Sequence, residues 1–186
     1  MSELSAIEVP LRQKNIVLIG FMGVGKTTVG QLVASKLYRD FVDVDLELEK
    51  KYSMSVSDIF ASMGEKKFRE MEEEFICDLV TSTRLKVISL GGGAFVNEKI
   101  RKTCLESSIV FYLDLSWDSW KKRLHLIMNN RPVLQDKSLD EIEELFYRRQ
   151  NYYENNNSKI ATDDLNPEEV ADYLVSSLKL GWELYE

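Results

Sequence analysis

The sequence of 186 residues has few of the residues that several classes of site require: two cysteines, one histidine and three prolines. Cys77 and Cys104 are far apart and match no metal-ligand spacing, so we expect two reduced thiols rather than a disulfide framework or a zinc site. The single histidine, His125, argues against a histidine-based catalytic triad or a histidine-rich metal site.

Two further absences limit the possible partners. No apolar run is long enough to span a bilayer, and residues 1–13 lack the basic start and apolar centre of a signal peptide, so we expect a cytoplasmic protein. The formal net charge of −7 argues against nucleic acid and against anionic membranes as partners. An anionic ligand would need local positive charge in so acidic a chain, so clustered Arg and Lys side chains are candidates for its binding site.

Strand-like and helix-like runs alternate along the chain. This alternation predicts a parallel sheet with helices on both faces, an α/β fold of the three-layer α/β/α sandwich type. We expect a single domain over residues 1–186, with a core of about 15–180 between short N- and C-terminal extensions. Ligands of such sheets bind beyond the carboxyl ends of the strands. The five predicted strands cover residues 15–19, 41–45, 87–90, 109–115 and 159–162, and the last predicted helix covers 167–179.

A glycine-rich segment follows the first predicted strand and reads Gly-Phe-Met-Gly-Val-Gly-Lys-Thr over residues 20–27. Its spacing is that of a P-loop, in which backbone N–H groups and a helix N-terminus surround phosphates. Lys26 is expected to bridge the β- and γ-phosphates, and the Thr27 hydroxyl to bind one Mg²⁺ ion. No Asn-Lys-x-Asp segment is present, which favours ATP over GTP. The predicted ATP-binding residues of this segment are Gly23, Val24, Gly25, Lys26, Thr27 and Thr28.

Two carboxylates end the second predicted strand, Asp43 and Asp45. Alternate side chains of a strand share a face, so both are expected to point into the same crevice. One could contribute to the Mg²⁺ shell, and the other could hold an acceptor hydroxyl and take its proton. The alternative is a solvated strand end followed by an acidic helix start.

Basic side chains and glycines supply candidates for binding an organic acid. Arg69 lies on a long amphipathic helix, where Glu72 is spaced to brace it, although an exposed helical ion pair is the alternative. Residues 91–93 are Gly91, Gly92 and Gly93, which would let a ligand lie against bare backbone.

A polar stretch of about 123–137 is expected to form a lid that excludes water during phosphoryl transfer. It contains Arg131, which could close onto the transferred phosphoryl group. Arg123 lies at the start of this stretch, at the end of the preceding predicted helix, and Arg148 and Arg149 lie on the helix after it. Taken singly, each of these arginines is also compatible with a simple surface charge.

In order and spacing, these segments resemble the shikimate kinase family over roughly residues 15–171. The shared parts are the P-loop, Asp43-Val44-Asp45, Gly64-Glu65 with Phe68-Arg69 and Glu72, Gly91-Gly92-Gly93-Ala94, Arg131-Pro132-Val133-Leu134, and Arg149 with Tyr152-Tyr153.

The resemblance implies transfer of the ATP γ-phosphate to the 3-hydroxyl of shikimate, giving 3-phosphoshikimate and ADP in the pathway to chorismate and aromatic amino acids. It implies catalytic roles for Lys26, Asp45 and Arg131. It also implies that Asp45, Arg69, Arg149 and the backbone of Gly91–Gly93 bind shikimate, that Arg123 and Arg131 contact ATP, and that Asp43 meets Mg²⁺ through water.

Three other functions stay open at this point. A kinase of gluconate-type sugar acids would have a similar P-loop and acid clamp, although the aspartate pair and the triple glycine count against it. A regulatory nucleotide-binding module would bind ATP without turnover, and a P-loop ATPase would drive a partner protein. We expect a monomer that binds ATP and shikimate, and the sequence assigns no role to residues 1–14 or 181–186.

Overall fold

The molecule is built around a five-stranded sheet in a computed structural model that describes residues 9–124, 134 and 137–185. All four strand pairs are parallel, and the strand order is β2-β3-β1-β4-β5. Every residue of the central strand β1 is buried, because neighbouring strands and helices cover both its edges and its faces. The strands are β1 (Asn15–Ile19), β2 (Asp40–Asp43), β3 (Lys86–Ser89), β4 (Ser108–Asp114) and β5 (Ser158–Ala161).

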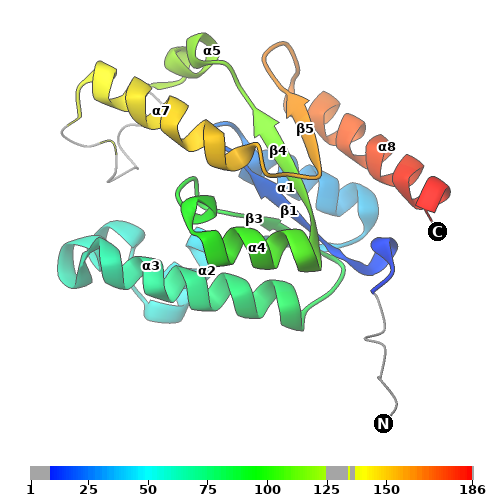
Figure 1. Ribbon diagram of the computed structural model, residues 1–186, viewed down its shortest axis with the longest axis horizontal. Helices are drawn as coiled ribbons and strands as arrows, with labels where there is room; N and C mark the ends of the chain where they lie inside the picture. The colour runs from blue at the N-terminus through cyan, green and yellow to red at the C-terminus, as the bar shows by residue number, and fades with distance from the viewer. Residues whose placement is uncertain (1–8, 125–133, 135–136, 186) are drawn as a thin grey trace.

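Helices cover the sheet on both sides. Helices α1 and α8 pack together on one face, and α3 and α4 pack together on the other, which gives the three-layer sandwich expected from the sequence (Figure 1). The helices are α1 (Lys26–Leu37), α2 (Val44–Tyr52), α3 (Val56–Ser82), α4 (Glu98–Ser107), α5 (Trp117–Lys122), α7 (Leu139–Tyr153) and α8 (Pro167–Tyr185), with 3-10 turns η1 (Leu11–Gln13) and η2 (Ala94–Val96). None of these described helices is long and apolar enough to cross a bilayer.

Side-chain caps fix where several helices begin. Asn97, Ser116 and Ser138 accept hydrogen bonds from backbone N–H groups in the first turns of α4, α5 and α7, and all three are of the residue types preferred at this position. Ser138 and Glu141 also form a reciprocal capping box. These caps satisfy backbone N–H groups that would otherwise lack a partner in the first turns of the three helices.

Two element boundaries differ from the sequence prediction by more than one residue. The second strand ends at Asp43, whose carboxylate accepts a hydrogen bond from the Leu46 N–H and so caps α2. Asp45 therefore lies in the first turn of a helix, and the expectation that both aspartates share one face of a strand is wrong. Helix α8 also continues past its predicted end near residue 179, through Gly181, to Tyr185.

The functional edge of the sheet follows from its parallel topology. The segments that leave β1, β2 and β3 are the P-loop, the start of α2 and the triple-glycine segment, and all three emerge at the carboxyl ends of neighbouring strands. Residues far apart in sequence thus meet at one edge of the sheet, where ligands of this fold class bind.

Candidate active site

The P-loop connects β1 to α1 and forms the first part of the site. Gly25, the residue before α1, has φ = 103°, a left-handed conformation that favours glycine. The buried ammonium group of Lys26 donates hydrogen bonds to the carbonyl oxygens of Gly20 (2.8 Å) and Phe21 (2.9 Å). The loop therefore curls around its own lysine next to a helix N-terminus, an arrangement suited to an oligophosphate.

A hydroxyl and a carboxylate lie together at the start of α1. The Thr27 hydroxyl donates a 2.7 Å hydrogen bond to Asp43 Oδ2, which joins the P-loop to the end of β2. Both groups are oxygen donors, the type that Mg²⁺ prefers, and Mg²⁺ usually binds one or two protein oxygens together with phosphates and water. No cluster of three or more His, Cys, Asp or Glu side chains suited to a metal occurs in the described part of the chain. The donor pair thus fits a metal that arrives with its nucleotide.

These groups line one hollow, which we call the phosphate compartment. It is formed by the P-loop, the end of β2 and the start of α2, and it runs up to the triple-glycine segment. Among its lining residues are Gly23, Gly25, Lys26, Thr27, Asp43, Asp45, Gly91 and Gly92.

A second hollow, which we call the acid compartment, adjoins the first. Its walls combine aromatic rings of α3 with the charged groups of Asp45, Arg69, Glu72 and Arg149. Arg69 and Arg149 come from α3 and α7, two helices that are far apart in sequence, and both open into this one hollow together with Asp45. Phe60, Phe68, Gly91, Gly92 and Gly93 complete most of the lining.

The two compartments share a wall. Met22, Asp45, Val56, Gly91 and Gly92 line both hollows. Asp45 therefore stands at the boundary between the groups suited to phosphate and those suited to an organic acid. An acceptor hydroxyl in the acid compartment would face a phosphoryl group across this boundary, which is the arrangement that transfer between two bound ligands requires.

The triple-glycine segment is packed so closely that a methyl group at any of its positions would require a neighbour to shift. A methyl group on Gly91 would lie 2.8 Å from Asp45 Oδ1, and one on Gly92 would lie 2.8 Å from the backbone nitrogen of Met22. A methyl group on Gly93 would lie 2.6 Å from Arg69 Nη2. The absence of side chains leaves room for the Asp45 carboxylate at Gly91, for the P-loop backbone at Gly92 and for the Arg69 guanidinium at Gly93.

Burial shapes the charges of the acid compartment. Arg69 Nη1 and Glu72 Oε2 form a 2.7 Å ion pair, and Glu72 is buried, so the alternative of an exposed helical pair does not apply. Burial raises the pKa of Glu72 to about 7, although the charge of Arg69 acts in the opposite direction. Burial lowers the pKa of the Arg149 guanidinium. Such shifted groups in a hollow are typical of functional sites.

Two buried polar atoms of this compartment have no hydrogen-bond partner among the residues that the structure describes. Glu72 Oε1 and Arg149 Nη1 make no hydrogen bond within the described residues. A buried donor without a partner costs free energy unless a ligand or water satisfies it. Arg149 Nη1 is therefore a donor suited to a carboxylate oxygen of a bound acid.

The remaining arginines predicted for the site have different outcomes. Arg123, the residue after α5, donates a 3.5 Å hydrogen bond to the carbonyl oxygen of Val24, which places it beside the P-loop. Arg131 lies outside the described residues, as does His125, and so does most of the predicted lid. The proposed closure of Arg131 onto the phosphates stays a prediction.

Two aromatic residues support the site in ways that the sequence did not assign. Trp120 on α5 donates a 2.7 Å hydrogen bond from Nε1 to the Met22 carbonyl oxygen and so fixes the P-loop backbone at this residue. No signal in the sequence marks this contact. The Tyr153 hydroxyl donates to the Gly92 carbonyl oxygen. Its position four residues after Arg149 places both on one face of α7, a signal that the sequence did contain.

Comparisons with known proteins identify the family to which this arrangement belongs. The family model "Shikimate kinase" matches residues 22–179. A shikimate kinase of Bacillus subtilis (strain 168) is 56% identical over 178 residues, which cover 96% of each chain. A shikimate kinase of Bacillus pumilus (strain SAFR-032) is 57% identical with the same coverage.

Solved structures agree with the sequence relatives. A shikimate kinase from Acinetobacter baumannii, solved in complex with shikimate, has a TM-score of 0.83 and 31% sequence identity, and the match covers 95% of this chain and 97% of that one. A gluconokinase from Sinorhizobium meliloti 1021 has a TM-score of 0.57 at 15% identity, which indicates a shared fold alone.

Proposed function

The chain belongs to the shikimate kinase family, and we propose that it transfers the γ-phosphate of ATP to the 3-hydroxyl of shikimate, giving 3-phosphoshikimate and ADP. The observation that carries this proposal is the shared wall between the phosphate and acid compartments, with Asp45 at the boundary. One substrate supplies the phosphoryl group from the P-loop side, and the other presents a hydroxyl from the side of the arginines.

The acid compartment binds shikimate by its carboxylate in this proposal. Arg69, held by Glu72, and Arg149, whose buried Nη1 has no partner among the described residues, form a two-sided clamp for that carboxylate. The backbone of Gly91–Gly93 borders the ring, because the absence of side chains leaves the ligand room there. The clamp fixes the orientation of the ring and thereby which hydroxyl faces Asp45.

Asp45 then orients the acceptor hydroxyl and takes its proton as the oxygen attacks the γ-phosphorus. The new O–P bond forms while the bond from the γ-phosphorus to the β,γ-bridging oxygen breaks, and ADP leaves. Lys26 turns from the loop carbonyls to the phosphates and stabilises the charge that accumulates on them.

Thr27 and Asp43 would hold Mg²⁺, Thr27 through its hydroxyl and Asp43 through water. The ion would neutralise phosphate charge when bound with ATP. Gly23, Val24, Gly25 and Thr28 border the phosphates, and Arg123 borders the nucleotide. We further propose that the protein acts as a monomer in the cytoplasm.

A coupled assay of ADP release tests the function. With ATP and Mg²⁺, we expect shikimate to accelerate ADP release, and gluconate or no acceptor to leave it at background. Lys26→Met should lose about 10²- to 10³-fold in kcat, the range for removal of one positioned donor to a transition-state charge. Turnover with gluconate equal to that with shikimate, or none with any acceptor, would refute the proposal.

A further inference from the structure

The hydroxyl of Tyr153 connects the last turn of α7 to the triple-glycine segment. Tyr153 is 1% exposed, and its hydroxyl donates a hydrogen bond to the carbonyl oxygen of Gly92. The same Gly92 backbone lies against the Met22 nitrogen on the P-loop side, where a methyl group would not fit. Gly92 is thus enclosed between α7 and the P-loop, at a position that lines both compartments.

Because the peptide unit is planar, a contact with the Gly92 carbonyl also affects the Gly93 N–H, which lies at the acid compartment. The Gly92 carbonyl and the Gly93 N–H belong to one planar trans unit and point in opposite directions. Because the carbonyl points to Tyr153, the Gly93 N–H must point away from it. Within the described residues no acceptor for this N–H is found, and Gly93 lines the acid compartment. The Tyr153 hydroxyl therefore fixes the direction of a backbone N–H that has no acceptor in the described part of the chain.

Tyr153 also stands beside the acid clamp. Arg149 lies four residues earlier on α7, so the two side chains share a face of the helix. Burial raises the pKa of the Tyr153 hydroxyl, while the nearby charge of Arg149 opposes that rise. The hydroxyl remains protonated, and so remains a donor, throughout the neutral pH range.

We infer that Tyr153 is a positioning residue for the acid substrate: its hydroxyl holds the Gly92–Gly93 peptide so that the Gly93 N–H faces a ligand clamped by Arg149. This inference rests on the proposed function, since it specifies how the same site holds shikimate. It concerns substrate binding more than the phosphoryl-transfer step, because Tyr153 itself touches neither Lys26 nor Asp45 in any described hydrogen bond.

The chain offers a matched control in Tyr112 on β4. Tyr112 is also buried, and its ring centroid lies 5.3 Å from that of Tyr153. Its hydroxyl donates to Asp114 Oδ1 (2.9 Å) instead of to the glycine segment. Tyr112→Phe and Tyr153→Phe therefore each remove one buried hydroxyl from the same aromatic pair, but only the second releases Gly92.

The experiment compares the full-length wild type with the two phenylalanine variants. We expect Tyr153→Phe to raise KM for shikimate about tenfold, while kcat and KM for ATP stay within about twofold. Tyr112→Phe should leave both KM values unchanged. Hydrogen exchange of the ligand-free chains, measured by mass spectrometry, should be faster at residues 90–96 in Tyr153→Phe and unchanged in Tyr112→Phe.

The outcomes separate this inference from the function on which it rests. Wild-type protein without shikimate-dependent turnover would refute the proposed function and this inference together. Wild-type turnover with an unchanged shikimate KM in Tyr153→Phe would refute the inference alone. Equal effects of the two variants on KM and on hydrogen exchange would show that Tyr153 only contributes to packing, and this result would also refute the inference.

Discussion

At the scale of single residues, the acid compartment is lined by charged side chains whose burial costs free energy. Glu72 is 1% exposed, and it interacts with Arg69, Asp45 and Arg149 at once. Its ion pair fixes the Arg69 guanidinium, but its other oxygen, Oε1, lacks a partner in the described chain. Removing such a carboxylate from water favours its protonated form.

This burial gives the stability of the protein a pH dependence of defined sign. The pKa of Glu72 is raised from 4.5 to about 7, so the folded chain binds its proton more tightly than the unfolded chain. The stabilisation is fully present below pH 4.5 and is lost as pH rises through about 7. Relative to Glu72→Gln, we expect the wild type to lose at most about 3 kcal/mol of unfolding free energy across this window in urea titrations.

The adjacent Glu73 is a control of opposite sign. Hydrogen bonds from Lys99 and Asn97 lower the pKa of Glu73, so its contribution is lost as pH falls rather than as it rises. The difference between the wild type and Glu73→Gln should therefore change in the other direction with pH. A Glu72→Gln profile parallel to that of the wild type would show that Glu72 does not titrate in this range.

At the scale of elements, the triple-glycine segment distinguishes two kinds of close approach. Next to Gly93 lies the end of the long Arg69 side chain, which can move, whereas next to Gly92 lies the backbone of Met22, which cannot. Gly93 has φ = −100°, a conformation that alanine also adopts. The two positions should therefore tolerate a methyl group very differently.

We expect Gly93→Ala to fold normally but to displace the Arg69 guanidinium from the acid compartment. Its KM for shikimate should rise about 10- to 100-fold, the range for loss of one hydrogen bond to a charged group, with KM for ATP unchanged. Gly92→Ala should lower the thermal midpoint and weaken both substrates. Steady-state kinetics and thermal unfolding measure these effects, and equal behaviour of the two variants would contradict the packing argument.

Elements were more predictable from the sequence than their contacts. The strand β1 is predicted from a local apolar run at residues 15–19, and the structure has it there. The caps of Asn97 and Ser138 and the break in α3 at Gly64 (φ = 83°) likewise depend on residues that are close in the chain. The start of α2 was misplaced because Asp43 serves as a strand end and a helix cap together. Apolar alternation alone cannot tell these two roles apart.

The site was predictable in composition but not in geometry. Asp45, Arg69 and Arg149 were identified as candidates, yet only the tertiary fold determines that α3 and α7 direct their arginines into one hollow. The contact from Trp120 to the Met22 carbonyl joins residues 98 positions apart and leaves no trace in local spacing. Hydrogen bonds of this kind depend on the packing of elements, which a single sequence does not encode locally.

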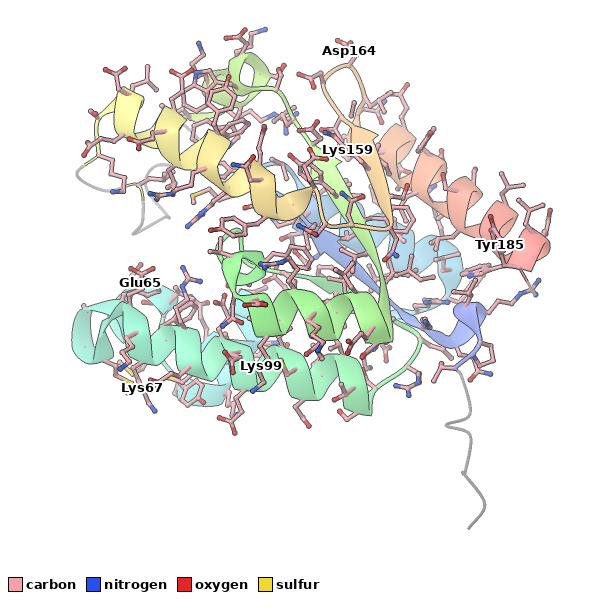
Figure 2. All side chains as sticks on the ribbon, viewed as in Figure 1. Glu65, Lys67, Lys99, Lys159, Asp164 and Tyr185 are labelled. Carbon is pink, nitrogen blue, oxygen red and sulfur yellow. The ribbon has the colours of Figure 1, made fainter. Side chains whose placement is uncertain are left out.

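At the scale of the whole molecule, the end of α8 is fastened at the edge opposite the site. Arg39 lies over the Trp182 ring, with Cζ 5.4 Å from its centroid, and donates hydrogen bonds to the carbonyl oxygens of Lys14 and Arg12. Figure 2 shows Tyr185 at the far end of α8 from Asp164, which precedes that helix. The C-terminal segment thus packs on the body of the protein near the start of β1.

We expect Trp182→Ala to lower the unfolding free energy by about 1–2 kcal/mol, because it removes a partly buried ring and a cation–π contact. Both KM values should remain unchanged, since the contact is at the opposite edge of the sheet. Tyr185→Ala, which removes a side chain that is 78% exposed, should change stability by less than about 0.5 kcal/mol. Urea unfolding and kinetics together test this separation, and a changed KM in Trp182→Ala would contradict it.

The wall common to the two compartments has a thermodynamic consequence. Met22, Asp45, Val56, Gly91 and Gly92 line both compartments, so in the proposed reaction the ligand that binds first would contact the same wall that the second ligand meets. On the proposed function, we expect the nucleotide and the acid to bind as linked events. Because free energy around the closed cycle of binding steps sums to zero, the factor by which one ligand changes the affinity for the other is the same in both directions.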